Sequence, residues 1–70
     1  AGPVVWERGE DFATAKKRLV EGLEREILRA ALREHGGNVS STARELGLHR
    51  QSLQQKLRRL GIDAAELSGS

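Results

Sequence analysis

Residues 38–62 read NVSSTARELGLHRQSLQQKLRRLGI, and this stretch decides the fold. Asn38 is a favourable N-cap, so a short helix is expected over residues 39–46. Gly47 follows, and its freedom to adopt a positive φ suits a tight turn. A second helix is expected over about residues 50–60, because its leucines recur at three- and four-residue steps. These leucines are Leu53, Leu57 and Leu60.

The two short helices have the spacing of a helix-turn-helix unit. Ala43 is small, as a close crossing of two helices requires, and Leu46 and Leu48 are expected to fill the space between them. In such a unit the second helix presents its N-terminus and its outer face to the major groove of DNA. The pattern therefore predicts a DNA-binding surface on residues 50–60.

The outer face of that second helix carries side chains suited to reading DNA bases. With Leu53 and Leu57 directed inward, helical geometry places four polar side chains outward. They are Gln51, Gln54, Gln55 and Arg58. Arginine can pair with guanine, and glutamine with adenine, through two hydrogen bonds each. Arg50 and Ser52 flank this face, and a solvated polar surface is the alternative interpretation of the glutamines.

The distribution of charge is more informative than its sum. The 70 residues contain 12 lysines and arginines and 10 acidic residues, and a net charge of +2 does not by itself indicate a nucleic-acid partner. Residues 7–34 mix both signs, whereas residues 47–62 contain no acid. The basic residues of the latter stretch are Arg50, Lys56, Arg58 and Arg59. A basic stripe on a mixed-charge body is typical of a phosphate-contacting surface.

A long helix is expected upstream, over about residues 11–35. Asp11 is a favourable N-cap, and Gly36 suits the left-handed position that ends a helix. Apolar side chains follow helical spacing along one stripe, and Val20, Leu28 and Leu32 lie beside it. The stripe comprises Phe12, Ala15, Leu19, Leu23, Ile27 and Ala30.

This helix is too long for the short segments downstream to cover. About 24 residues extend for roughly 36 Å at 1.5 Å per residue. A second copy of the helix would cover the excess, and a chain this small also gains stability from self-association. The sequence therefore predicts a homodimer. The predicted interface comprises Phe12, Leu19, Val20, Leu23 and Ile27.

The two ends of the chain are expected to be less regular. Residues 1–10, which contain Gly2, Pro3 and Gly9, are interpreted as a linker from an upstream domain. Within them the cluster over residues 4–6, Val-Val-Trp, either packs against the first helix or belongs to an interface with that domain. Ile62 is expected to fold back onto the core, and most of residues 63–70 to form a frayed tail.

Composition excludes several classes. Aromatic residues make up only 3% of the chain, which favours an all-α fold over strands. The chain has no cysteine, and His35 and His49 cannot form a structural zinc site alone. No apolar run exceeds three residues, so no membrane span is expected, and a cytoplasmic location is the default.

Enzymatic function is not expected. The sequence shows no nucleophile–base pair, glycine-rich phosphate loop or paired carboxylate, and Glu24 and Glu26 are interpreted as charges on a helix surface. No catalytic residue, cofactor, metal ion or small-molecule substrate is therefore expected.

Residues 38–62 resemble the helix-turn-helix of the Fis family, and more closely the C-terminal DNA-binding domain of bacterial enhancer-binding proteins of the NtrC type. The motifs are GGN, the turn A-x-x-L-G-[LI], R-x-x-L-x-x-K-L and a final L-G-I. Residues 23–37, LEREILRAALREHGG, resemble the long preceding helix of that family, so the likeness covers about residues 12–62. The resemblance implies a Fis-like homodimer that binds an inverted repeat and bends its DNA.

The resemblance also assigns individual residues. It implies base contacts for the start and outer face of the second helix: His49, Arg50, Gln51, Gln54 and Gln55. It implies phosphate or backbone contacts for Ser40, Ser52, Lys56, Arg58 and Arg59, although helical spacing places Lys56 nearer the core. Gln54 and Gln55 stand where Fis itself has lysine or arginine, which favours a sequence-specific regulator over an abundant nucleoid protein.

The family further implies partners outside this chain. In a full-length activator an ATPase domain lies upstream, commonly with a receiver or sensor domain before it, and RNA polymerase carries an alternative sigma factor. The location would be the bacterial cytoplasm, at the nucleoid. Two alternatives remain: a free-standing Fis-like architectural protein, and a helical module that binds another protein through its apolar stripe. The latter gives no reason for the absence of acids from residues 47–62.

Overall fold

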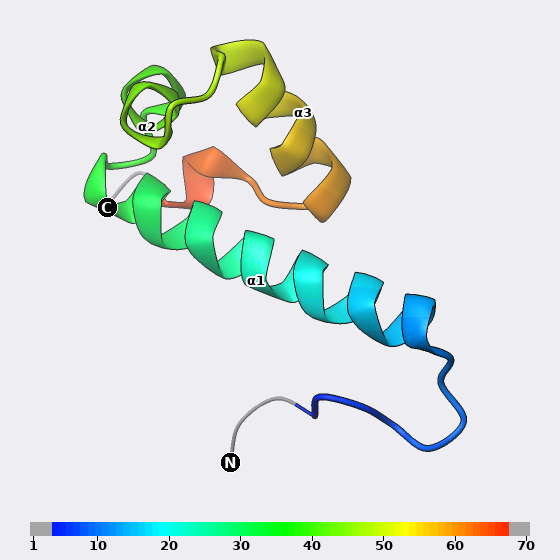
Figure 1. Ribbon diagram of the computed structural model, residues 1–70. Helices are drawn as coiled ribbons and strands as arrows, with labels where there is room; N and C mark the ends of the chain where they lie inside the picture. The colour runs from blue at the N-terminus through cyan, green and yellow to red at the C-terminus, as the bar shows by residue number, and fades with distance from the viewer. Residues whose placement is uncertain (1–3, 68–70) are drawn as a thin grey trace.

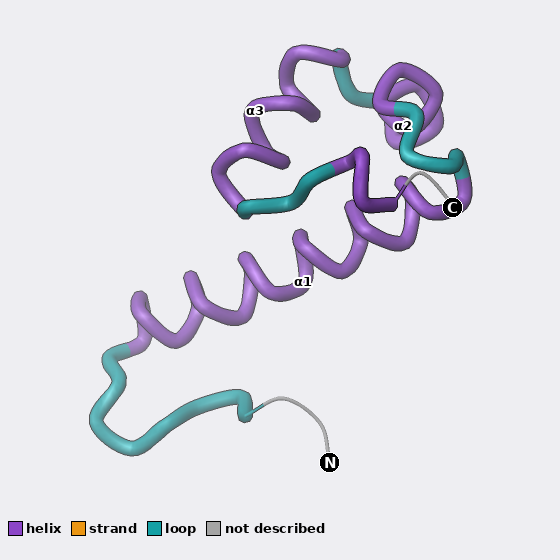
Figure 2. The backbone as a smooth tube through the Cα atoms, turned by 180° about the vertical axis from the view of Figure 1, so that it is seen from behind, coloured by secondary structure: helices purple, strands orange, loops and turns teal. Residues whose placement is uncertain are grey.

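The computed structural model describes residues 4–67, which form helices joined by turns and loops and contain no strand. Helix α1 spans Phe12–Glu34, α2 spans Val39–Leu46, α3 spans Arg50–Leu60, and a short 3-10 helix, η1, spans Ala64–Leu67. The all-α prediction is confirmed. None of these helices is long and apolar enough to cross a bilayer. Figures 1 and 2 show α2, α3 and η1 gathered over the C-terminal half of α1, while its N-terminal half extends beyond them.

The expected caps begin the first two helices. The Asp11 carboxylate accepts a hydrogen bond of 2.8 Å from the Thr14 amide, and this bond lowers the pKa of Asp11. The Asn38 side chain accepts one of 3.0 Å from the Ser41 amide. Each bond pairs an amide that a helix N-terminus would otherwise leave without a partner. His49 occupies the same position before α3 but makes no capping hydrogen bond with its side chain.

The turn between α2 and α3 depends on Gly47. Its φ of 72° lies in the left-handed region, where a side chain is strained. This backbone conformation lets the Leu48 amide donate a 2.8 Å hydrogen bond to the Ala43 carbonyl. The bond gives a partner to a carbonyl that the C-terminal end of α2 would otherwise leave unpaired. The chain therefore changes direction at Gly47, and α3 begins at Arg50, two residues after Leu48.

The core lies between the three helices. Leu28 and Leu32 come from α1, and Ala43 of α2 is buried at the crossing as expected. The remaining buried members are Leu53, Leu57, Leu60 and Ile62. Leu46 and Leu48 are half-buried against this cluster, and Ile62 folds back onto it, as the sequence predicted.

The predicted apolar stripe of α1 does not face this core. Leu28 and Leu32, placed beside the stripe by the sequence, are the residues that α1 contributes to the core. Most of the stripe is exposed, with 82% of Phe12, 61% of Leu23 and 56% of Ile27 accessible. The helix therefore has two apolar faces, and α2 and α3 cover only one of them.

The expectation of a frayed tail is wrong for residues 64–67. They form η1, in which Ala64 and Leu67 pack against the core, and the Asp63 carboxylate accepts a 3.0 Å hydrogen bond from the Ala65 amide. Residues 1–3 and 68–70, which belong to the expected linker and tail, lie outside the described residues.

Candidate nucleic-acid interface

The outer surface of α3 brings together most of the predicted base-contacting residues. Leu53, Leu57 and Leu60 hold one side of the helix in the core. His49, Arg50, Gln51 and Gln55 are exposed, and so is Arg58 near the other end of the helix. Gln54 and Lys56 are both half-buried. They lie on opposite flanks of α3, because two residues correspond to about 200° around the helix. Ser40 lies apart from this group, exposed at the start of α2.

The imidazole of His49 is not used to cap α3. It is exposed at the N-terminus of the helix and accepts no capping hydrogen bond from the first turn.

The four predicted cations of α3 fall into two pairs. Within the described residues, Arg50 and Arg58 form no ion pair with a carboxylate. Arg59 and Lys56 both reach Glu24 of α1, at 3.2 Å and 3.8 Å respectively. Glu24, interpreted from the sequence as a surface charge, is instead a bridge between the two helices.

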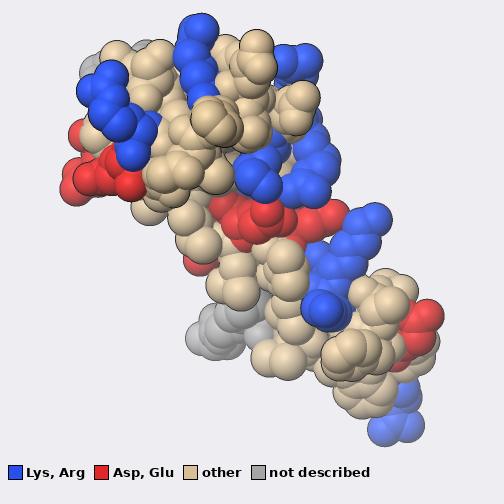
Figure 3. Space-filling view, turned by 45° about the horizontal axis from the view of Figure 1, so that its top comes forward, with Lys and Arg blue, Asp and Glu red and all other residues tan. Residues whose placement is uncertain are grey.

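A hollow with a mixed polar and apolar lining lies on the flank of α3 whose cations pair with α1. It has a volume of about 360 Å³ and is lined by Leu48, Ser52, Gln55, Lys56 and Arg59. Figure 3 shows lysines and arginines over the helix-turn-helix, bordered by a band of acidic side chains where it meets α1. Ser52 and Gln55 thus share one surface with the paired cations.

Two further polar contacts set the orientation of the helix-turn-helix on α1. The Arg25 guanidinium donates to the Leu60 carbonyl at the end of α3, at 3.4 Å. The His35 ring lies 2.8 Å from the Glu45 carboxylate of α2. The partners in the first pair are 35 residues apart, so no local sequence signal could have identified them.

The segment before α1, residues 4–10, folds back as an arm along the first turns of that helix. Arg18 holds it, with Nη2 2.7 Å and Nε 2.8 Å from the Glu10 carboxylate and with Nη1 2.8 Å from the Val4 carbonyl. The Arg18 hydrogen bond lowers the pKa of Glu10 to about 2. The Trp6 indole donates to the Glu10 carbonyl at 3.0 Å.

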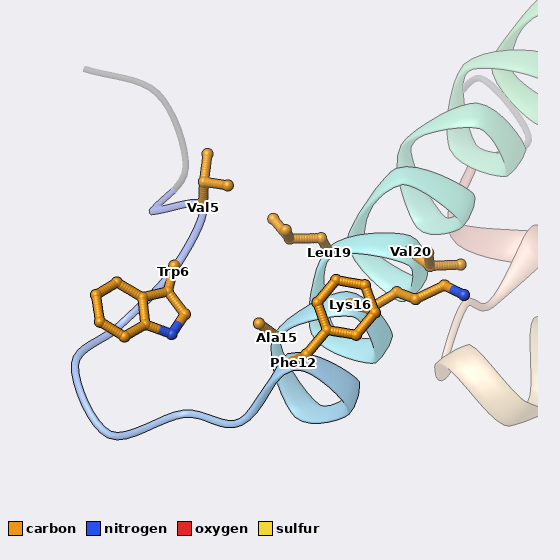
Figure 4. A pocket seen from close by; sticks show the side chains of 7 residues that line it. All are labelled: Val5, Trp6, Phe12, Ala15, Lys16, Leu19 and Val20. Carbon is orange, nitrogen blue, oxygen red and sulfur yellow. The ribbon is translucent and has the colours of Figure 1, made fainter.

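An apolar hollow of about 550 Å³ lies between the arm and α1 (Figure 4). Ala15 and Leu19 project toward the arm, which carries Val5 and Trp6. Three predicted interface residues, Phe12, Leu19 and Val20, line the hollow. Leu23 and Ile27 continue the exposed apolar face along α1. Val4, Val5 and Trp6 are 54–67% exposed, so Arg18 holds the arm on α1 by hydrogen bonds to its backbone rather than by burial of this cluster.

Metal ligands are not gathered in the described part of the chain, since residues 4–67 contain no group of three or more histidine and acidic side chains placed to hold an ion.

Comparison with known proteins identifies relatives of this domain. The transcriptional activator RocR of Bacillus subtilis is 40% identical over 50 residues, which cover 71% of this chain and 11% of RocR. The nitrogen assimilation regulatory protein NtrX of Azorhizobium caulinodans is 45% identical over 42 residues, 60% of this chain and 9% of NtrX. The chain thus spans about a tenth of the length of these relatives. No solved structure matches it.

The family model described as bacterial regulatory protein, Fis family, matches residues 19–60. These residues include most of α1, all of α2 and all of α3. The match covers more than half of the 70 residues and contains the complete helix-turn-helix, as the sequence motifs predicted. This chain belongs to the Fis family of bacterial regulatory proteins.

Proposed function

We propose that this chain is the DNA-binding domain of a bacterial transcriptional activator and that it binds an inverted repeat as a homodimer. The observation that carries the proposal is the outer face of α3, where Arg50, Gln51 and Gln55 are exposed beside a turn of helix-turn-helix geometry. These side chain types form paired hydrogen bonds with guanine and adenine in the major groove.

The contacts divide into two kinds. His49, Arg50, Gln51 and Gln55 read bases from the start and outer face of α3, and the half-buried Gln54 reads from its flank. Phosphate contacts come from the basic side chains and hydroxyls around that face. These residues are Ser40, Ser52, Lys56, Arg58 and Arg59.

The homodimer is proposed from the uncovered apolar face of α1. Phe12, Val20, Leu23 and Ile27 are each between 43% and 82% exposed, and Leu19 lies beside them. Contiguous apolar surface of this kind marks an interface, because burying it removes apolar area from water. A two-fold axis through α1 presents two copies of α3 to half-sites about one helical turn, roughly 34–36 Å, apart.

The remainder of the activator is also part of the proposal. RocR is named a transcriptional activator, and this chain corresponds to 11% of its length. An upstream ATPase domain, a receiver or sensor domain and RNA polymerase with an alternative sigma factor are the partners expected of an NtrC-type activator. The domain would act in the cytoplasm, at the nucleoid.

The proposal is tested by selecting bound fragments from a random DNA pool at near-physiological salt. An enriched inverted repeat is the expected result. A variant carrying both Arg50→Ala and Gln51→Ala keeps the phosphate contacts, so it should retain DNA without enriching the repeat. Retention of DNA by the unmodified chain without enrichment would indicate an architectural role, and no retention would indicate a protein-binding module.

A further inference from the structure

One carboxylate occupies two of the cations that the proposed function assigns to phosphates. The Glu24 oxygens lie 3.2 and 3.3 Å from Arg59 Nη2, and Oε2 lies 3.8 Å from Lys56 Nζ. The Glu24 side chain is 29% exposed, less than either partner, so it is partly covered where α1 meets α3.

The other two cations of α3 differ in this respect. Arg50 and Arg58 are exposed and form no ion pair within residues 4–67. The basic surface of α3 therefore consists of one available pair and one pair that is already neutralised in part by the same chain.

We infer that Glu24 is an intramolecular competitor of the DNA backbone, which lowers the affinity of the domain for all DNA sequences by occupying Lys56 and Arg59. The inference rests on the proposed function. A carboxylate and a phosphate accept the same charge-assisted hydrogen bonds from ammonium and guanidinium groups. Lys56 and Arg59 must therefore give up Glu24 in order to meet a phosphate, and the released carboxylate then lies near a polyanion.

This competition has a consequence for the salt dependence of binding. Each phosphate that a cation neutralises releases counterions from the duplex, which makes affinity fall as salt rises. A carboxylate that loses its partners takes up a cation from solution and offsets part of that release. The unmodified protein should therefore show a shallower salt dependence than a protein without this carboxylate.

The test is Glu24→Gln, measured as the dissociation constant on the selected repeat and on a random duplex across a range of salt. Binding of both duplexes should tighten by a similar factor, about 1.5- to 5-fold, the value of an exposed ion pair. The slope of log K against log salt should become steeper by up to about 0.9.

The matched control is Glu26→Gln, which removes the same charge from the same helix. Glu26 is exposed and takes part in no ion pair of the described residues. Glu26→Gln should therefore change the affinity for DNA and the salt slope much less than Glu24→Gln. Circular dichroism melts establish that each variant is folded, and Glu24→Ala serves as a second removal of the carboxylate.

A second background isolates the local contact. In a protein that carries Lys56→Gln and Arg59→Gln, the competition is gone, so the further change Glu24→Gln should affect binding no more than Glu26→Gln does. In the otherwise unmodified protein, weaker binding by Glu24→Gln would make Glu24 a positioning residue and overturn the inference, as would an effect equal to that of Glu26→Gln. Failure of the unmodified chain to bind any DNA would instead overturn the proposed function.

Discussion

Arg50 and Arg58 stand at opposite ends of α3, and the proposed function gives them different tasks. Arg50 is the first residue of the helix, at the end proposed to enter a major groove, whereas Arg58 lies in its last turn. Both are exposed. A cation at the entering end can reach a base edge, and a cation at the far end meets the sugar-phosphate backbone.

We expect Arg50→Ala to cost about 1–3 kcal/mol at the selected repeat and to relax specificity at one base pair. Arg58→Ala should weaken binding to all sequences alike and reduce the salt slope by roughly one contact. Titrations on matched and single-mismatch duplexes separate the two effects. Identical behaviour of the two variants would contradict the division into base and phosphate contacts.

Gly47 offers a test of the turn itself. A Cβ added at this residue would meet no heavy atom within 4 Å, so substitution carries only the strain of its φ of 72°. Gly47→Ala should therefore destabilise the fold by about 1–2 kcal/mol. Gly22→Ala is the matched control, because that glycine lies inside α1 with equally open space, and alanine there should stabilise by about 1 kcal/mol. Thermal melts should therefore move in opposite directions.

At the scale of elements, the arm over residues 4–10 is tied to α1 by Arg18, which forms an ion pair with Glu10 and also donates to the Val4 and Val5 carbonyls. The Arg18 hydrogen bond holds the pKa of Glu10 at about 2, against 4.5 in an unstructured chain. Because the folded pKa is the lower one, the contribution of this pair is complete above about pH 4.5 and is lost as pH falls toward 2.

Acid should therefore release the arm between about pH 4.5 and 2, with Trp6 as the reporter, since it is the single tryptophan of the chain. A change of Trp6 fluorescence in this window is expected for the unmodified protein. Glu10→Gln removes the titrating group, so its fluorescence should stay flat over the same range. A transition that persists in this variant would show that another group holds the arm.

Helix α1 has two apolar faces, and its periodicity alone does not show which of them enters the core. Spacing of three and four residues identifies an amphipathic helix but does not say what covers each part of it. Leu28 and Leu32 enter the core because α2 and α3 lie over the C-terminal half of α1, and Leu23 and Ile27 remain exposed on another side.

At the scale of the whole molecule, the single chain has a small core and a large uncovered apolar surface. A chain of this size buries only about 60% of the surface that it exposes when unfolded. The uncovered face of α1 continues into the hollow of about 550 Å³ beneath the arm. A second copy of the chain on this face would bury apolar side chains that a single copy leaves exposed.

We expect Leu23→Glu to raise the dissociation constant of the proposed dimer by about 100-fold or more, because an unpaired charge is costly to bury. Arg29→Glu is the control, since Arg29 is exposed about 120° around α1 and the substitution changes the charge by more. Sedimentation equilibrium compares the two variants. A Leu23→Glu protein that remained dimeric would exclude this residue from the interface.

The local features of this protein follow from its sequence alone. Asp11 and Asn38 cap the first two helices, Gly47 makes the turn, and the leucines of α3 face inward, because each depends on interactions within a few residues of the chain. The helix-turn-helix and its Fis family were identifiable for the same reason. The DNA contacts and the dimer interface assigned from the sequence remain predictions.

Only the tertiary structure decided which distant groups meet. It pairs Glu24 with Arg59, 35 residues away, ties the arm to Arg18, and packs Leu67 onto the core where a frayed tail was expected. Spacing along a helix determines which side chains share a face. The partner of that face depends on how the helices cross, and the crossing results from packing the core residues of all three helices together.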